Sequence, residues 1–382
     1  MAGLSRDEVL RYSRHLVMPE VTLEGQLRLK RARVLCVGAG GLGSPLTLYL
    51  AAAGVGTLGI VDFDTVDLTN IQRQILYSTS DVGRLKLDAA RERLAQLNPE
   101  IEIVPHSMRL ASWNVMDLLE NYDIIADGAD NFPTRYLVND ACVLAGKPDV
   151  YASIFRFEGQ VSVFDARRGP CYRCLFPEPP PPGLVPSCAD GGVLGVLPGI
   201  VGSLQALEVL KLILGVGEPL IGRLVLFDAL GFRFREVALR KDSRCVVCGE
   251  EPSIDAPIDY EEFCGSRGDE ADVDASGILS LSVEELRARR QAGETFDLLD
   301  VREPHEYEIV RIPGAKLFPL GELPSRLHEL DPARTYTISC HRGVRSLEAY
   351  HLLRKAGFRR LQVLLGGVDA WAERIDASMP RY

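Results

Sequence analysis

The stretch 32–44, ARVLCVGAGGLGS, constrains the fold of this chain more than any other. Its apolar run VLCV is typical of a strand buried on both faces of a parallel sheet. Leu46–Ala53 then has the pattern of a helix, and between the two stand glycines at the spacing G-x-G-x-x-G: Gly38, Gly40 and Gly43. Such glycines allow a tight turn and let backbone N–H groups approach a phosphate at the positive end of the helix. The stretch therefore predicts a nucleotide-binding strand–turn–helix unit.

The carboxylate of Asp62 ends the next apolar run, 24 positions after Gly38. A carboxylate meets a ribose hydroxyl at about this distance along the chain in nucleotide-binding units. A glycine turn without a ligand is the alternative for the glycines alone. Strand, helix and spaced carboxylate together favour nucleotide binding, without saying which nucleotide.

Further strands and helices alternate along residues 1–250. The expected helices are Ser5–Leu16 (with Ser5 as cap and Glu8 three positions later), Val82–Leu97 and Gly199–Leu214. The expected strands are Ile101–Pro105, Tyr122–Asp127, Gly146–Ile154, Val161–Phe164 and Leu224–Asp228. This alternation favours an α/β fold with a Rossmann-like, doubly wound parallel sheet.

A second, independent α/β pattern occupies residues 278–382. Its expected helices are Ser282–Gln291 and Ser346–Ala356, and its expected strands are Phe296–Asp300, Tyr336–Ser339 and Val363–Leu365. Between the two patterns lies an acidic stretch, 249–277, with ten acids against one base. We therefore expect a first domain at 1–250, an acidic linker at 251–277 and a second domain at 278–382.

Charge and hydropathy exclude several classes of function. The net charge of −10 is concentrated in the acidic stretch, so we expect no basic face for nucleic acid. No apolar run reaches the roughly eighteen residues of a membrane span, and the first residues lack the apolar core of a signal peptide. Nine cysteines, an odd count, argue against a disulfide framework and for metal or thiol chemistry. A cytoplasmic protein is expected.

Three further features could serve a nucleotide. Arg73 ends the motif TNIQR and Lys86 opens an expected helix, so both cations could contact a triphosphate, although surface cations are the alternative. Asp130 and Asn131 follow an apolar strand, where ligands of open α/β sheets bind. Asp130 could hold Mg²⁺ on the phosphates, or one of the two residues could simply cap the next helix.

The remaining chemistry lies in cysteines. Four form two C-x-x-C pairs, which predict a closed structural zinc site, with two separate redox pairs as the alternative: Cys171, Cys174, Cys245 and Cys248. Cys188, just after a proline-rich loop, could be a nucleophile, a resolving cysteine or a plain loop residue.

Cys340 begins the motif CHRGVRS between an expected strand and an expected helix. Backbone N–H groups at such a turn stabilise a thiolate or a persulfide anion, and Arg345 adds a fixed cation. An inert buried cysteine is one alternative. A tyrosine-phosphatase-like loop is another, but it needs one residue more between cysteine and arginine than the four found here.

In their order along the chain, these motifs resemble a known family. GAGGLGS, DFDTVDLTNIQRQ, GRLKLDAA, DGADNFPTRYLVND, CYRC, SCADGGVLGVLPG and CVVCG resemble the MoeB/ThiF enzymes, relatives of ubiquitin-activating enzymes. DVREPHEYEIVRIPGA and CHRGVRS resemble a rhodanese domain, and the fusion is similar to MoeZ-type adenylyltransferase/sulfurtransferases. The likeness covers nearly the whole chain.

The resemblance implies that a small ubiquitin-like sulfur carrier protein, of the MoaD/ThiS type, is activated in two steps. Its C-terminal glycine carboxylate attacks ATP, giving an acyl-adenylate, and sulfur then displaces AMP to leave a thiocarboxylate. Thiosulfate or a cysteine desulfurase persulfide would donate the sulfur.

The resemblance also implies roles for individual residues. Arg14 would reach into the ATP site of a partner subunit, implying a homodimer, Cys188 would lie on a crossover loop, and Cys340 would carry the persulfide. The implied ATP site, with Mg²⁺, comprises Gly41, Asp62, Thr69, Asn70, Ile71, Gln72, Arg73, Lys86, Asp130 and Asn131.

Two other classes of function remain as alternatives. A nicotinamide- or flavin-dependent oxidoreductase would use the same glycine motif, but it explains neither TNIQR nor the second domain. A binding scaffold with a decayed site is disfavoured because the charged set is intact.

Overall fold

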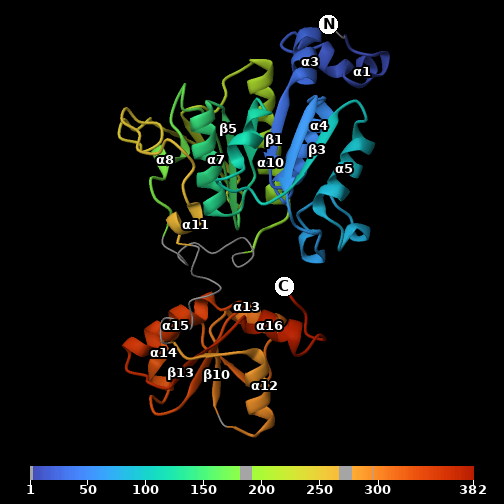
Figure 1. Cartoon of the computed structure of the whole chain (residues 1–382). Coiled ribbons are helices and arrows are strands. Elements are labelled where there is room, and N and C mark those ends of the chain that lie inside the picture. The colour runs from blue at the N-terminus through green and yellow to red at the C-terminus, as the bar shows by residue number, and fades with distance from the viewer. Residues whose placement is uncertain (1–2, 181–191, 266–277, 295) are drawn as a thin grey trace. The chain divides into compact units, whose positions relative to one another are not determined.

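The computed structural model describes residues 3–180, 192–265, 278–294 and 296–382, and it contains two compact units (Figure 1). The first unit continues to Cys264, so the expected linker boundary at residue 251 lies too early. Tyr260 and Cys264 are buried in this unit, among the acids of the stretch. Apolar anchors between the acidic residues therefore hold 251–264 on the first unit. Residues 266–277 lie outside the described part of the chain.

The first unit is an α/β domain whose elements follow the expected alternation. Its strands are β1 (Arg33–Val37), β2 (Thr57–Asp62), β3 (Glu102–Ser107), β4 (Ile124–Asp127), β5 (Asp149–Phe155), β6 (Glu158–Phe164), β7 (Arg223–Asp228) and β8 (Arg233–Ala238). Its helices are α1 (Arg6–Arg11), α2 (Ser13–Leu16), α3 (Thr22–Arg31), α4 (Gly43–Ala53), α5 (Lys86–Leu97), α6 (Val115–Glu120), α7 (Phe132–Ala145), α8 (Tyr172–Leu175), α10 (Val196–Leu214) and α11 (Tyr260–Phe263), with short 3₁₀ turns η1 (Leu68–Asn70) and η2 (Thr79–Asp81).

The strands form one eight-stranded sheet in the order β3-β2-β1-β4-β5-β6-β7-β8. The pairs from β3 to β5 are parallel, whereas β6, β7 and β8 are antiparallel to their neighbours. The doubly wound parallel sheet is thus confirmed for its first five strands and extended by an antiparallel part. The strand order reverses between β1 and β4, and ligands of open α/β sheets bind beside such a switch point.

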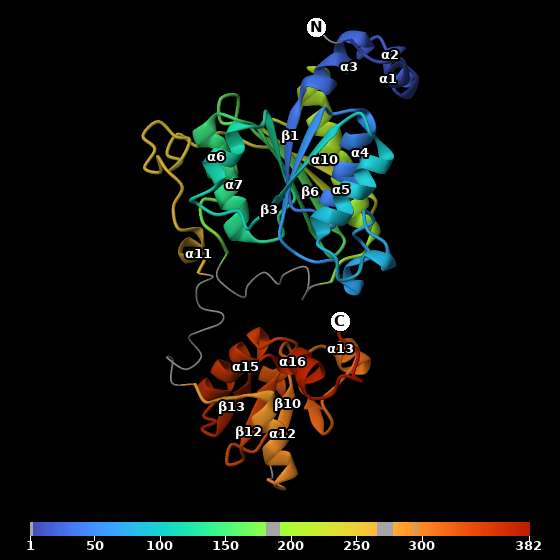
Figure 2. The same ribbon diagram turned by 45° about the vertical axis from the view of Figure 1, so that its right-hand side comes forward.

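Helices cover both faces of this sheet. One face packs against α3, α4, α5 and α10, and the other against α6, α7, α8 and α11. Figures 1 and 2 show α7 on one side of the strands and α4, α5 and α10 on the other. Both faces of the central strands are therefore buried, as the continuous apolar run of β1 predicts.

Local sequence explains where several elements begin and end. Ser5 and Glu8 form the predicted capping box, but the expected helix to Leu16 breaks into α1 and α2 at Tyr12. The helix expected from Val82 starts only at Lys86, because Gly83 takes a positive φ of 86°. Likewise Gly146, with a φ of 63°, ends α7, so β5 starts later than expected.

One described helix, α10, is long and apolar enough to cross a membrane by length and composition alone. In this unit α10 packs against α4, β5 and β6. Its residues Val201, Ala206 and Val209 are buried in the apolar cluster of that face. The apolar composition of α10 thus serves the core of the first unit.

The second unit is a smaller α/β domain with a parallel sheet in the order β11-β10-β12-β13-β9. Apolar clusters lie on both sheet faces, one including α14 and α15 and the other α12 and α16. Its strands are β9 (Ser280–Leu281), β10 (Asp297–Asp300), β11 (Ala315–Leu317), β12 (Tyr336–Ser339) and β13 (Leu361–Leu364). Its helices are α12 (Val283–Gln291), α13 (Pro304–Ile309), α14 (Leu323–Arg326), α15 (Val344–Lys355) and α16 (Gly367–Arg374), with the 3₁₀ turn η4 (Leu327–Glu329).

Candidate active sites

A cavity of about 250 Å³ opens where β1, β2 and β4 end in the first unit. It brings together residues from the glycine turn, the end of β2, the start of α5 and the turn before α7. The sequence-predicted residues that line it are Gly38, Gly40, Gly41, Asp62, Arg73, Lys86, Asp130 and Asn131. Motifs separated by up to about ninety residues thus meet at one pocket.

The glycine turn requires glycine at two positions. Gly38 has a φ of 88°, a conformation that other residues rarely adopt. A Cβ on Gly43 would lie 2.1 Å from the carbonyl oxygen of Gly38. Gly43 is therefore absent from the cavity lining but lets the turn close at the start of α4.

Asp62 lines the cavity and also stabilises the glycine turn by accepting backbone hydrogen bonds. Its Oδ2 accepts a 2.8 Å hydrogen bond from the backbone N–H of Ala39, and its Oδ1 accepts a 2.9 Å bond from the N–H of Asp64. Both bonds fix the carboxylate in place, while carboxylate oxygens keep further lone pairs for a ligand. The geometry is thus compatible with the expected contact to a ribose hydroxyl.

Two cations reach the cavity by different routes. The ammonium of Lys86 is nearly buried and lies 2.8 Å from Oδ2 of Asp64. The guanidinium of Arg73 donates to the carbonyl oxygen of Thr69 at 3.0 Å. Among the described residues, one cation is therefore held by a carboxylate and the other by a backbone carbonyl.

The rest of the TNIQR motif does not reach the cavity. Thr69 and Asn70 belong to the 3₁₀ turn η1, which Asp67 caps. Ile71 packs against the apolar core, and the backbone of Gln72 lies close to Gly195 before α10. The motif holds the backbone that carries Arg73.

In the turn before α7, Asn131 caps the helix and Asp130 lines the cavity. Asn131 caps α7 by accepting a 3.0 Å hydrogen bond from the N–H of Thr134. Asp130 lines the cavity, and its Oδ1 accepts a 3.4 Å hydrogen bond from Nδ2 of Asn131. The capping alternative therefore applies to Asn131 and leaves the Asp130 carboxylate to face the cavity.

Gln74 and Arg135 are among the cavity residues that sequence reasoning missed. Gln74 is buried, and its Oε1 has no hydrogen-bond partner among the described residues. Arg135 donates to the carbonyl oxygen of Ala129 and lies over the ring of Tyr151. Arg135 stands four residues after Asn131, so helical spacing could have placed it on the cavity side of α7.

Below the cavity lies a buried carboxyl group. Burial raises the pKa of Asp127 to about 6, against the opposing effect of Arg135. Asp149 on β5 is also fully buried, and burial together with Asp127 raises its pKa well above the usual range. This pair therefore favours a protonated carboxyl group under the turn that carries Asp130.

Two predicted residues stand outside this geometry. Arg14 is exposed on α2 and does not line the cavity of its own chain. Cys188 lies outside the described residues.

The two C-x-x-C pairs form a single cluster. All four sulfurs lie within 4.8 Å of one another, although 70 residues separate the pairs: Cys171, Cys174, Cys245 and Cys248. The backbone N–H of Asp242 donates to Sγ of Cys174 at 3.4 Å. Four soft ligands at this mutual distance could hold a metal ion such as zinc, and the pairs are not separate redox centres.

A buried arginine, Arg173 of α8, lies between the first two cysteines of the cluster. Arg173 forms a forked ion pair with Asp140 of α7, with contacts of 2.8 Å. Its guanidinium lies over the rings of Tyr136 and Phe263, and Tyr260 donates to the same carboxylate. Helices α8, α7 and α11 are thus joined through the guanidinium of Arg173.

Cys340 of the second unit directly follows β12 and lies in the turn before α15. Its side chain is almost fully buried, and the N–H of Gly343 donates to Sγ at 3.1 Å. The hydroxyl of Ser346 lies 3.6 Å from the sulfur. The predicted strand–cysteine–helix arrangement is present, with a backbone donor directed at the sulfur.

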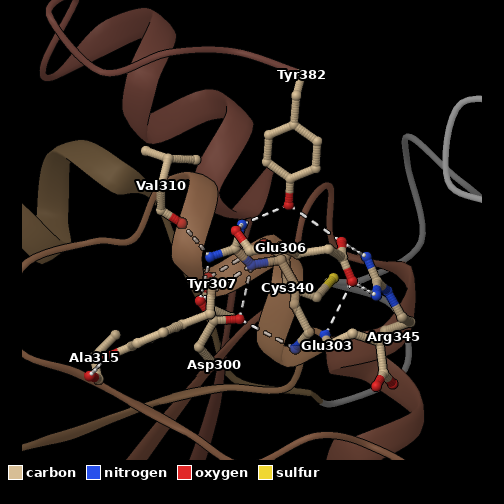
Figure 3. A network of polar contacts seen from close by, with 11 residues as sticks. Asp300, Glu303, Glu306, Tyr307, Val310, Ala315, Cys340, Arg345 and Tyr382 are labelled. Atoms are coloured by element: carbon tan, nitrogen blue, oxygen red, sulfur yellow. Dashed lines mark hydrogen bonds and ion pairs between the residues drawn. The ribbon is translucent and has the colours of Figure 1, made fainter. Parts of the chain in front are cut away.

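Arg345, predicted as a fixed cation beside Cys340, has a carboxylate partner. It forms a forked ion pair with Glu306 of α13, with contacts of 2.6 and 2.7 Å (Figure 3). Tyr382 donates to the same carboxylate at 3.2 Å and accepts a 2.6 Å bond from Arg302. Sequence reasoning missed Glu306, which lies 39 residues before its partner.

Comparison with known proteins agrees with these two sites. Residues 12–247 match the model of the ThiF family, and residues 282–374 match the rhodanese-like domain. The chain belongs to the ThiF family. This ThiF-family chain is 51% identical over 387 residues to a probable adenylyltransferase/sulfurtransferase MoeZ of Mycobacterium tuberculosis, covering 100% of this chain and 97% of that protein. It is 43% identical to the adenylyltransferase and sulfurtransferase MOCS3 of Mus musculus, covering 100% and 89%.

Solved structures show the same fold for the ThiF-family part. Escherichia coli MccB in a crystal structure with MccA-N7isoASN matches with a TM-score of 0.57 at 24% identity, covering 64% of this chain and 75% of that chain. A structure of MccB with ATP matches with a TM-score of 0.55, covering 63% and 73%. The chain is an enzyme of the adenylyltransferase and sulfurtransferase type, and nothing supports the oxidoreductase alternative.

Proposed function

We propose that this enzyme adenylylates the C-terminal glycine of a ubiquitin-like sulfur carrier protein of the MoaD/ThiS type and then converts it to a thiocarboxylate. The observation that carries the proposal is the meeting of Asp62, Arg73, Lys86 and Asp130 around one cavity at the switch point of the sheet. The names of the MoeZ and MOCS3 relatives support the same two activities.

In the first step ATP occupies the cavity. The turn from Gly38 to Gly43 places backbone N–H groups at the positive end of α4, where phosphates bind. Arg73 and Lys86 offset charge on the phosphates as the carrier carboxylate attacks and pyrophosphate leaves. Asp130 would hold Mg²⁺, which supplies further charge neutralisation on the phosphates.

Sulfur transfer follows, with the second unit as the sulfur donor. The terminal sulfur of a persulfide on Cys340 attacks the acyl carbon, and AMP leaves. A thiolate then attacks the Cys340 sulfur, which releases the thiocarboxylate and forms a disulfide that a cellular thiol reduces. Cys188 is the proposed attacking group, and thiosulfate or a desulfurase persulfide is the proposed source of sulfur.

Three further assignments accompany the proposal. The four-cysteine cluster holds one structural zinc ion, because tetrahedral thiolate sites of this kind leave no open position for catalysis. Arg14 completes the ATP site of a second copy in a homodimer, in line with its exposure on α2. The enzyme works in the cytoplasm.

The test is ATP–pyrophosphate exchange that depends on a carrier ending in Gly-Gly. Lys86→Ala and Arg73→Ala should each lower exchange by about 100-fold or more, because each removes a charge that the transition state needs. Arg91→Ala, on the exposed side of α5, is the control and should leave exchange unchanged. Normal exchange in both cavity variants would refute ATP binding at this cavity.

A further inference from the structure

The ion pair between Arg345 and Glu306 determines the charge beside the reactive cysteine. Both guanidinium nitrogens of the fork meet both carboxylate oxygens, and Figure 3 shows the pair next to Cys340. The Glu306 side chain is 9% exposed and that of Arg345 is 26% exposed. Forked, charge-assisted pairs of this kind are among the strong hydrogen bonds of proteins.

Glu306 is fixed in this place by two further donors. The N–H of Glu303 donates to Oε2 at 3.0 Å, and Tyr382 donates to Oε1. Burial alone would raise the pKa of Glu306, but the bonds from Arg345, Glu303 and Tyr382 lower it to about 2. The carboxylate is therefore charged at neutral pH and cancels the guanidinium.

Other arginines near the loop also have carboxylate partners. Arg342, within the loop, lies 3.8 Å from Asp369, and Arg381 contacts the same carboxylate at 2.8 Å. Asp369 is joined to the loop, because its N–H donates to the carbonyl oxygen of His341. Arg381 also contacts Glu373 at 3.1 Å. Among the described residues, each arginine of the Cys340 loop thus has a carboxylate partner.

This charge balance matters for the choice of sulfur donor. Thiosulfate is a dianion, and a site that binds it well needs positive charge that no acid offsets. A persulfide of a thiol delivers the same sulfur without the sulfonate group. A balanced loop therefore discriminates against the dianion and not against the persulfide.

We propose that Glu306 is a specificity-determining residue that cancels the charge of Arg345 and so lowers the affinity of the Cys340 loop for dianionic sulfur donors. The proposal rests on the proposed role of Cys340 as sulfur acceptor. With thiosulfate, the Cys340 thiolate attacks the outer sulfur, the S–S bond breaks, and its electron pair leaves with sulfite. With a persulfide R–S–SH, the same attack on the terminal sulfur releases the thiolate R–S⁻.

The experiment measures the gain of one sulfur on the Cys340 peptide by mass spectrometry, using the full chain and single-turnover conditions. The donors are thiosulfate and 2-mercaptoethanol persulfide, which carries no charge apart from that of its sulfurs. Glu306→Gln should lower the thiosulfate concentration for half-maximal rate by about tenfold, because it leaves Arg345 charged. The half-saturating concentration of the persulfide should change by less than about twofold, because this donor lacks the charged sulfonate group.

Glu308→Gln is the matched control, since Glu308 lies exposed on the same helix and the change removes the same charge. It should leave both values unchanged. A mere loss of structure would weaken both donors, so tighter thiosulfate saturation separates a specificity role from a structural one.

A second pair of variants tests the same charge balance if Glu306→Gln does not fold. Arg345→Met leaves Glu306 unmatched and should raise the half-saturating thiosulfate concentration. Glu306→Met with Arg345→Met removes both charges and should return it toward the wild-type value, because apolar pairs often replace buried ion pairs without loss of fold.

An unchanged or higher half-saturating concentration in folded Glu306→Gln, or an equal change for both donors, would overturn the proposal for Glu306 alone. If wild-type Cys340 gained sulfur from neither donor, the proposed function of the loop would fail as well.

Discussion

The turn from β1 to α4 and the turn from β12 to α15 have the same local design but different contents. Both follow a parallel strand and end at the start of a helix. The first borders an open cavity, whereas the second is occupied by the sulfur of Cys340, which accepts a hydrogen bond from Gly343. Both turns therefore have a backbone that favours anions. Side chains from other elements determine which ligand or reaction each turn serves.

Those side chains differ in how their charge is balanced. Around the cavity, Lys86 is paired with Asp64, but Arg73 donates to a backbone carbonyl and Asp130 caps no helix. Around Cys340, Arg345 is paired with Glu306. The first arrangement suits a highly charged nucleotide with its metal ion, and the second suits a sulfur atom held by a protein thiol.

The largest expected effect separates the chemistry of the two turns. Cys340→Ala should keep ATP–pyrophosphate exchange and reduce thiosulfate-driven thiocarboxylate formation by at least about 100-fold, because it removes the nucleophile. The mass of the carrier reports the exchange of oxygen for sulfur. Added inorganic sulfide should restore the product, since sulfide attacks the adenylate directly. Full thiosulfate-driven conversion by this variant would exclude Cys340 as the sulfur carrier.

Metal removal should weaken only the unit that contains the open cavity. Cys171→Ser should lower the zinc content of the chain and reduce the unfolding free energy of the first unit by roughly several kcal/mol, because metal binding and folding are coupled. The melting temperature of that unit should fall with it. Metal analysis and calorimetry of the full chain measure both. Cys142→Ser, at a buried cysteine outside the cluster, should leave the zinc content unchanged. A metal-free wild-type protein would contradict the assignment.

Both turns contain a glycine in close contact with the backbone, and replacing either glycine should cause a smaller loss of stability. A Cβ on Gly43 would lie 2.1 Å from the Gly38 oxygen, and one on Gly367 would lie 2.2 Å from the Cys340 oxygen. Gly43→Ala and Gly367→Ala should each cost about 3 kcal/mol of unfolding free energy. Gly41→Ala meets Pro198 at 3.3 Å and should cost much less. Equal effects of Gly41→Ala and Gly43→Ala in denaturant titrations would contradict this account.

The smallest expected effect concerns pH and distinguishes the buried acids of the two units. The folded-state pKa of Asp127 is raised to about 6, so this group stabilises the fold as pH falls from 6 toward its unfolded value near 4. The pKa of Glu306 is lowered to about 2, so its stabilising contribution is complete above about pH 4.5 and is lost as the pH falls toward 2.

Asp127→Asn should therefore raise unfolding free energy at pH 8, on the order of 1–2 kcal/mol, and flatten its decline between pH 5 and 7. Denaturant titrations of the full chain at several pH values measure this difference. Glu306→Gln should leave the slope over that interval as in the wild type. A lower stability of Asp127→Asn at pH 8 would contradict the proposed cost of ionising this group.

Sequence reasoning succeeded where the signal is local. The capping box of Ser5, the glycine turn and the carboxylate of Asp62 depend on residues within about 25 positions, and each pattern records a backbone constraint. The order of motifs along the chain was enough to predict both α/β units. The antiparallel pairing of strands β6 to β8 was not predicted, because an apolar run does not show whether the neighbouring strand is parallel or antiparallel.

Side-chain partners across the fold were the part that sequence could not supply. Nothing in the spacing of Glu306 and Arg345 indicates a shared ion pair, since their approach depends on how α13 and α15 pack around the sheet. Gln74 stood beside a predicted residue but gave no signal of burial. Such contacts depend on tertiary packing, which overrides local pattern.

Arg173 links the cysteine cluster to the packing of α11. Arg173 lies between Cys171 and Cys174, so loss of a metal from the cluster would also free the Arg173 side chain to move. This side chain contacts α11 directly at Phe263, and indirectly through Asp140, which accepts a hydrogen bond from Tyr260. A chain that fails to acquire zinc would therefore present aromatic side chains and an unpaired charge at once, which is the surface that proteases and chaperones recognise. Limited proteolysis of the chelator-treated protein should accordingly begin between residues 251 and 265.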